Sequence, residues 1–269
     1  MVSDKVRIAL QIQPQHADYD VIRQAVAKAE EMGVDIAYNW DHFFPLFGGD
    51  PDPNAGKHFE CWTMLAAWAE QTSKIEIGPL VTCNSYRNPQ LLADMARTVD
   101  HISGGRLIFG IGSGWFEKDY VEYGYEFGTA PSRLRDLDAA MPRIMDRWSK
   151  LDPPSTRKIP VLIGGGGPKV TLRITAEHAD VWHYFGTPEE MAGKSAILDD
   201  HCARIGRDPA EIERSVGIQQ HRITKDLEQN ADAYYDVGIR QFTIGLSGPD
   251  YPLDGVAEWL AWRDAKNAG

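Results

Sequence analysis

The chain has 269 residues and a formal net charge of −11 at pH 7, which excludes a general nucleic-acid- or anionic-membrane-binding protein, since both need a dense basic face. Three isolated cysteines without CxxC spacing support neither a disulfide framework nor a zinc site, and no apolar run approaches membrane-spanning length. We therefore expect a soluble, cytosolic protein that holds any anionic ligand locally.

Short β-branched runs alternate with amphipathic helical stretches along the chain. Eight strands are predicted, over residues 6–12, 35–40, 75–81, 106–111, 159–164, 180–184, 214–219 and 240–246. Eight parallel strands joined by crossover helices predict a closed (β/α)8 TIM barrel at this length, rather than an open doubly wound sheet. Because no linker divides the chain, residues 1–269 are predicted to form a single domain.

The helices between these strands carry start and stop signals. An apolar face over residues 21–32 ends at Gly33, and Asn88-Pro89 supplies an N-cap with proline in the first turn of another helix. Pro142 lies within a later helical pattern and predicts a break there, because proline removes a backbone N–H and clashes with the preceding turn.

Two long connections follow predicted strands two and four, over residues 42–59 and 113–131. Both leave the carboxyl ends of strands, where barrel enzymes assemble their active sites. Residues 115–127 are rich in aromatic side chains, which either cover an aromatic ligand as a lid or pack on one another. Both interpretations fit the sequence.

Four consecutive glycines, at positions 164–167, separate predicted strand five from a helix that is expected to begin at Pro168. Glycine loses much conformational freedom on folding, so the run implies a backbone shape or a close approach that side chains forbid. Free amides before a helix form an anion site, although a tight turn without a ligand fits equally well. Strand four ends in a second glycine-rich exit, which includes Ser113 and Gly114.

Asp41 and His42 are adjacent at the exit of predicted strand two, where barrel enzymes place reactive groups. His42 is a candidate proton donor or acceptor, and Asp41 either orients it or binds a ring N–H. The alternative is a capping aspartate beside a packed histidine. No HExxH or GxSxG pattern is present, so neither a metal site nor acyl transfer is expected.

Three stretches together resemble the luciferase-like oxidoreductases, most closely the branch that uses the deazaflavin coenzyme F420. They are Thr-Cys-Asn-Ser-Tyr-Arg-Asn-Pro at residues 82–89, the segment 100–115 around Gly-Ile-Gly-Ser-Gly-Trp, and Ile-Gly-Gly-Gly-Gly-Pro-Lys with Ala-Glu-His-Ala-Asp-Val-Trp at 163–182. The resemblance covers nearly the whole chain. It implies a luciferase-like TIM barrel, a homodimer, and hydride transfer between the deazaflavin C5 and a small organic substrate.

The resemblance also implies roles for particular residues. His42 becomes the proton donor and Asp41 a contact of the deazaflavin end. The remaining cofactor contacts are Leu80, Val81 and Thr82 behind the ring, Ser113 and Gly114 on the rim, and Gly165, Gly166 and Gly167 at the phosphate. A non-proline cis peptide is expected near residues 80–82, at a bond that the resemblance does not fix.

Three other functions remain open from the sequence. A luciferase-like monooxygenase that uses FMN would need the same glycine turn for its phosphate. A non-catalytic deazaflavin- or flavin-binding protein would bind the cofactor without turnover. A sugar-phosphate isomerase or aldolase is disfavoured, because its phosphate turn normally follows strand seven or eight.

Overall fold

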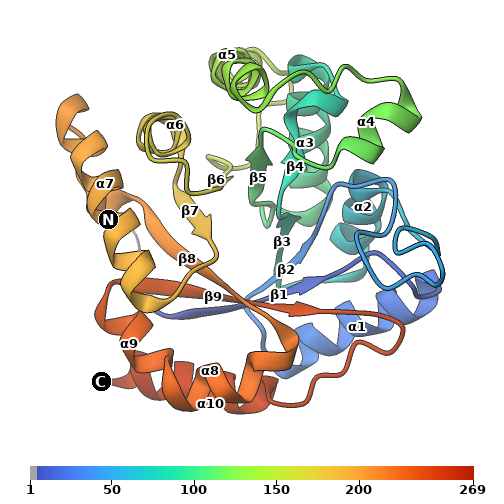
Figure 1. The fold of residues 1–269 in the computed structure, drawn as a ribbon, viewed down its shortest axis with the longest axis vertical. Helices are drawn as coiled ribbons and strands as arrows, with labels where there is room; N and C mark the ends of the chain where they lie inside the picture. The colour runs from blue at the N-terminus through green and yellow to red at the C-terminus, as the bar shows by residue number, and fades with distance from the viewer. Residues whose placement is uncertain (1–4) are drawn as a thin grey trace.

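In a computed structural model that describes residues 5–269, a ring of parallel strands is surrounded by helices (Figure 1). The strand segments are β1 (Arg7–Ile12), β2 (Ile36–Asn39), β3 (Glu76–Pro79), β4 (Thr82–Cys83), β5 (Phe109–Gly112), β6 (Val161–Gly164), β7 (Val181–Tyr184), β8 (Glu213–Ile218) and β9 (Ile239–Leu246). Their order in the sheet is β3-β2-β1-β9-β8-β7-β6-β5-β4. The predicted TIM barrel is confirmed.

The structure has nine segments for the eight predicted strands because one barrel strand is divided at residues 80–81 into β3 and β4. A cis peptide bond joins Leu80 to Val81 between them, which fixes the bond that the sequence left open. The ring closes where Ile77 pairs with Leu107, just before β5. A Cβ on Gly110 would lie 2.0 Å from the Pro79 carbonyl oxygen, so only glycine permits this close approach.

Helices cover the outside of the ring (Figure 1). They are α1 (Tyr19–Met32), α2 (Cys61–Gln71), α3 (Pro89–Ser103), α4 (Glu117–Tyr123), α5 (Ala130–Trp148), α6 (Thr171–His178), α7 (Pro188–Ile205), α8 (Ile223–Gln229), α9 (Ala231–Asp236) and α10 (Val256–Ala268). The predicted end of one helix and the predicted start of another are confirmed. Gly33 ends α1 in a left-handed conformation, and the Asn88 side chain accepts hydrogen bonds from two backbone amides of α3. Within the described part of the chain, no helix is long and apolar enough to cross a membrane.

The predicted break at Pro142 is wrong, because α5 continues through it. An internal proline costs a helix about 3 kcal/mol. The same stretch buries Leu137, Ala140, Met141 and Ile144, and burying one large apolar side chain gains about 1.5–3 kcal/mol. Packing on the barrel therefore outweighs the lost hydrogen bond.

The amino-terminal end of the barrel is filled by an ionic cluster. Arg7 lies 2.5 Å from Glu213 and 2.6 Å from Glu76, and it also donates to the side-chain oxygen of Gln241 at 3.1 Å. Above this cluster, Gln241 and Ser215 are completely buried in the barrel interior. The amino-terminal end of the barrel is thus closed, and the open space lies at the carboxyl ends of the strands.

Candidate functional site

Two adjoining cavities open at the carboxyl ends of the strands. The larger, of about 490 Å³, lies over β4–β7 and reaches the exit of β2. The smaller, of about 330 Å³, lies over β8, β9 and the end of β1. The two share wall residues, namely Gln11, Trp40, Leu80, His183 and Phe185. Both volumes lie in the range typical of small-molecule sites.

Most residues that the sequence singled out line the larger cavity. They are Asp41, His42, Leu80, Val81, Ser113, Gly114 and Gly165. Thr82 lies behind the wall and is fully buried, whereas Gly166 and Gly167 lie beyond the cavity's edge. The structure therefore brings the strand-two exit and the two glycine-rich exits around one space.

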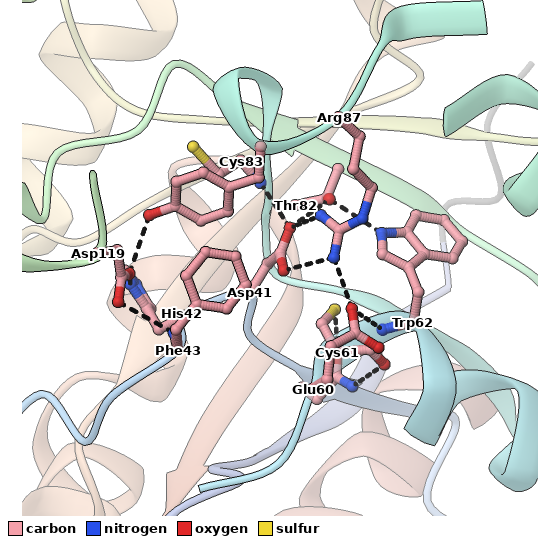
Figure 2. Close-up of polar contacts among 12 residues, drawn as sticks. Asp41, His42, Phe43, Glu60, Cys61, Trp62, Thr82, Cys83, Arg87 and Asp119 are labelled. Atoms are coloured by element: carbon pink, nitrogen blue, oxygen red, sulfur yellow. Dashed lines mark hydrogen bonds and ion pairs between the residues drawn. The ribbon is translucent and has the colours of Figure 1, made fainter. Parts of the chain in front are cut away.

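Asp41 is held in a buried ion pair rather than beside His42 (Figure 2). Its carboxylate accepts from Arg87 at 2.5 and 3.1 Å, from the Thr82 hydroxyl at 2.6 Å and from the Cys83 N–H at 3.0 Å. Burial by itself would lower the pKa of Arg87, but the charge and the hydrogen bonds of Asp41 raise it above its ordinary value. Because both carboxylate oxygens are engaged, Asp41 fixes β4 to the exit of β2.

His42 belongs to a separate network on the other side of the chain (Figure 2). Its Nδ1 lies 2.6 Å from a carboxylate oxygen of Asp119, whose side chain is fully buried. Asp119 also accepts from the Phe43 N–H at 3.0 Å and from the Tyr86 hydroxyl at 2.9 Å. Since a carboxylate only accepts, Nδ1 carries the proton, and Nε2 is the ring nitrogen left for proton transfer.

The aromatic segment 115–127 packs on the other long loop more than it covers the cavity. Phe43 stacks on Tyr123 at 4.0 Å between ring centroids, and Tyr120 is completely buried. Of the aromatic side chains in this segment, Trp115 alone lines the larger cavity; it lies edge-on to His42 at 5.7 Å and is 62% exposed. The lid interpretation therefore holds for one ring, and mutual packing accounts for most of the others.

The back of the larger cavity is an apolar wall built around Val81. A Cβ on Gly112 would lie 2.8 Å from a Val81 methyl group, and a Cβ on Gly164 would lie 3.2 Å from the other. These glycines therefore leave room for the valine across the ends of β5 and β6. The Val81 side chain therefore presents an apolar surface to the cavity between these two glycines.

The glycine run is used differently from the sequence prediction. The Gly165 N–H already donates to the His183 carbonyl at 3.0 Å, as a continuation of the β6–β7 pairing. A Cβ on Gly166 would lie 2.6 Å from the Tyr184 ring. Close packing against this ring is therefore the reason that residue 166 is a glycine. Within residues 5–269, the N–H groups of Gly166 and Gly167 donate to no acceptor, and Lys194 lies against this turn, with its ammonium group 2.7 Å from the Gly166 oxygen.

The helix after the turn also begins later than expected. It starts at Thr171 instead of Pro168, so the proline belongs to the turn. A Cβ on Gly167 would lie 2.7 Å from the Thr171 hydroxyl, which shows how closely the turn folds back on the helix. The free amides consequently lie one turn away from the helix end.

His183, at the end of β7, is a site residue that the sequence reasoning missed. It lines both cavities, is 3% exposed, and its Nε2 has no hydrogen-bond partner in the described chain. Burial lowers the pKa of His183 to about 3, so the ring is neutral at physiological pH. Its place at the carboxyl end of a predicted strand was an available signal.

Arg87, Asp119 and Lys194 were missed for another reason. Each comes from a helix or a loop, and its approach to the site depends on how the chain packs. No spacing in a single sequence pairs residue 41 with 87, or residue 42 with 119. The long 113–131 connection was the one clue that an acid from this loop reaches the rim.

Comparison with known proteins identifies the family to which this chain is similar. The profile of the luciferase-like monooxygenase family matches residues 1–266. An uncharacterised protein of Mycobacterium tuberculosis (strain ATCC 25618 / H37Rv) is 25% identical over 235 residues, covering 81% of this chain and 79% of that protein. The F420-dependent glucose-6-phosphate dehydrogenase of Amycolatopsis mediterranei (strain U-32) is 29% identical over 170 residues, covering 56% of this chain and 49% of that protein.

Solved structures share the fold. An F420-dependent secondary alcohol dehydrogenase in complex with an F420-acetone adduct matches with a TM-score of 0.80 at 16% identity, covering 94% of this chain and 98% of that one. The coenzyme F420-dependent tetrahydromethanopterin reductase from Methanopyrus kandleri matches at 0.71 and 16%, covering 94% and 96%. A riboflavin lyase with modified FMN matches at 0.69 and 14%, covering 85% and 67%.

Proposed function

The chain belongs to the luciferase-like monooxygenase family, and from this premise we propose that it is a coenzyme F420-dependent oxidoreductase acting on a small organic substrate. The observation that carries the proposal is the larger cavity, whose lining includes both His42, paired with Asp119 through Nδ1, and the apolar side chain of Val81. The F420-dependent enzymes among the relatives and the solved folds support the choice of cofactor.

The residues around the larger cavity fit a deazaflavin. The wall at Val81, made possible by Gly112 and Gly164, would hold the flat ring on one face. The free amides of Gly166 and Gly167 would hold the phosphate, with Lys194 adding positive charge beside them. A local cation matters because the protein as a whole is strongly acidic.

His42 is the proposed acid and base of the reaction. Asp119 fixes the orientation of the ring through Nδ1, so Nε2 is the nitrogen that would donate or accept the proton. The Phe43 N–H and the Tyr86 hydroxyl hold Asp119 in place, which makes it a positioning residue. Asp41 is assigned a structural role at the base of the site, because Arg87 occupies its carboxylate.

When bound, the reduced deazaflavin supplies a hydride, that is, one proton with two electrons. For a carbonyl substrate, His42 Nε2 would give its proton to the substrate oxygen, so that reduction of the carbonyl carbon would yield an alcohol. In the opposite direction, His42 removes the hydroxyl proton of an alcohol. The largely apolar wall and Trp115 restrict water around the reacting atoms.

Cofactor binding tests the proposal directly. Oxidised F420 and FMN are titrated separately into purified protein and followed by cofactor fluorescence. We expect F420 to bind at least tenfold more tightly. Tighter binding of FMN would favour a flavin monooxygenase instead. Tight F420 binding without turnover of alcohols, aldehydes, ketones, imines or activated alkenes would indicate a non-catalytic cofactor-binding protein.

We also propose a cytoplasmic homodimer, following the family resemblance. Light scattering coupled to size-exclusion chromatography measures the assembly state, and a monomer of 30.1 kDa would contradict it.

A further inference from the structure

The smaller cavity adjoins the larger one, shares part of its wall, and has been given no role in the proposed function. We infer that it binds the substrate, that this substrate is uncharged and carries hydroxyl, carbonyl or amide oxygen, and that His183 Nε2 donates a hydrogen bond to it. The inference rests on the proposed function, since it assumes that the deazaflavin occupies the larger cavity.

The lining of the smaller cavity sets the substrate class. Its polar side chains are amides and hydroxyls, with two histidines, namely Gln11, Gln13, Gln219, Gln220, Thr243, Ser247, His183 and His221. Within the described chain, no lysine, arginine, aspartate or glutamate lines it. A carboxylate or phosphate placed there would lose its hydration without gaining a lysine or arginine partner, which disfavours such anions. Amides and hydroxyls both donate and accept, so they suit a neutral oxygen-bearing molecule.

A chain of hydrogen bonds is the basis for assigning the proton on the His183 ring. Arg7 only donates, so the Gln241 oxygen faces it at 3.1 Å, and the Gln241 amide nitrogen therefore donates to Ser215 at 3.0 Å. The Ser215 hydroxyl lies 2.8 Å from His183 Nδ1 and 3.4 Å from the Thr243 hydroxyl, and we assign its hydrogen to the shorter of these two contacts. Nδ1 is thereby an acceptor, and the neutral ring carries its hydrogen on Nε2.

This leaves a buried N–H without an acceptor, at the wall that both cavities share. An unsatisfied buried donor costs about 1–3 kcal/mol and is rare in folded proteins. A substrate oxygen in the smaller cavity would satisfy it. Phe185 packs edge-on against the His183 ring at 5.1 Å between ring centroids and lines both cavities.

Matched compounds test the substrate class. With saturating reduced F420, initial rates are compared for 5-hydroxy-2-pentanone against 4-oxopentanoate, and for hydroxyacetone against dihydroxyacetone phosphate. We expect the neutral member of each pair to have a KM at least tenfold lower. A preference for the carboxylate or the phosphate would overturn the inference.

A second readout needs neither cofactor nor turnover. Protein labelled with ¹⁵N at histidine is titrated with 5-hydroxy-2-pentanone, and the Nε2 resonance of His183 is assigned from its loss in His183→Phe. We expect this resonance to shift, and the shift to be at least tenfold weaker with 4-oxopentanoate at equal concentration. If the hydroxyketone neither moves the resonance nor turns over, the inference is wrong.

Two variants complete the test. His183→Phe should raise the KM for the hydroxyketone at least tenfold and leave the F420 Kd within twofold, whereas His183→Gln, which retains a donor, should recover part of that loss. An unchanged KM in His183→Phe contradicts the role of the N–H. Absence of F420 binding by wild-type protein, with a normal His183 response, would reject the proposed function but would still show that the smaller cavity binds the neutral hydroxyketone.

Discussion

The buried pair between Arg87 and Asp41 gives the sharpest test of how the site is held together. Replacing Arg87 with methionine removes the guanidinium and retains an apolar stem. The Asp41 carboxylate, 0% exposed, then keeps only the Thr82 hydroxyl and the Cys83 N–H as partners. Removing one partner of a buried pair costs about 3–5 kcal/mol, which is a large share of the 5–15 kcal/mol by which proteins are typically stable.

The measurement is urea unfolding followed by the fluorescence of the eight tryptophans. Arg87→Met should lower the midpoint without changing the slope, which would show that stability and not compactness has changed. Arg147→Met is the matched control, because Arg147 forms a two-pronged pair with Asp94 at 3.1 and 3.2 Å on the helical surface. That variant should behave nearly like wild type.

A double variant distinguishes the loss of the ion-pair attraction from the cost of leaving the Asp41 carboxylate buried without its partner. Asp41→Asn combined with Arg87→Met removes both charges, so it should be more stable than Arg87→Met alone. A loss below about 1 kcal/mol in Arg87→Met, the range of exposed ion pairs, would refute our account of Asp41 as a structural anchor.

Three further predictions concern the site. His42→Ala should lower kcat by about a hundredfold or more and leave the F420 Kd within threefold, measured by steady-state kinetics and fluorescence titration; unchanged kcat would return His42 to a packing role. Gly166→Ala should weaken F420 binding because its Cβ meets Tyr184, whereas Gly193→Ala, which meets nothing within 4 Å, should not; equal affinities would remove the glycine turn from the site. Between pH 7 and pH 5 the free energy of unfolding should fall by about 2 kcal/mol through His183, because the unfolded imidazole binds a proton near its ordinary pKa of 6.5 while the buried one does not until about pH 3. The contribution of His183 to the free energy of unfolding is complete above pH 6.5 and decreases as the pH falls. In urea titrations at pH 7 and pH 5, His183→Gln should therefore show a smaller decrease in the free energy of unfolding than wild type.

The sequence by itself determined the architecture of this protein. All eight predicted strands lie in the barrel, because burial on both faces of a parallel strand demands continuous β-branched runs. The same local chemistry placed the caps at Gly33 and Asn88 and located the glycine-rich exits and His42 at the rim. These features depend on neighbours a few residues away, so the order of residues specifies them.

Only the tertiary structure decided how the side chains are used. Asp41 and His42 are adjacent in the chain, yet they face Arg87 and Asp119, which lie 46 and 77 residues further on. The helix through Pro142 and the neutral ring of His183 likewise depend on burial by distant segments. Partner choice and desolvation are properties of packed surfaces, and for that reason no local pattern in the sequence encodes them.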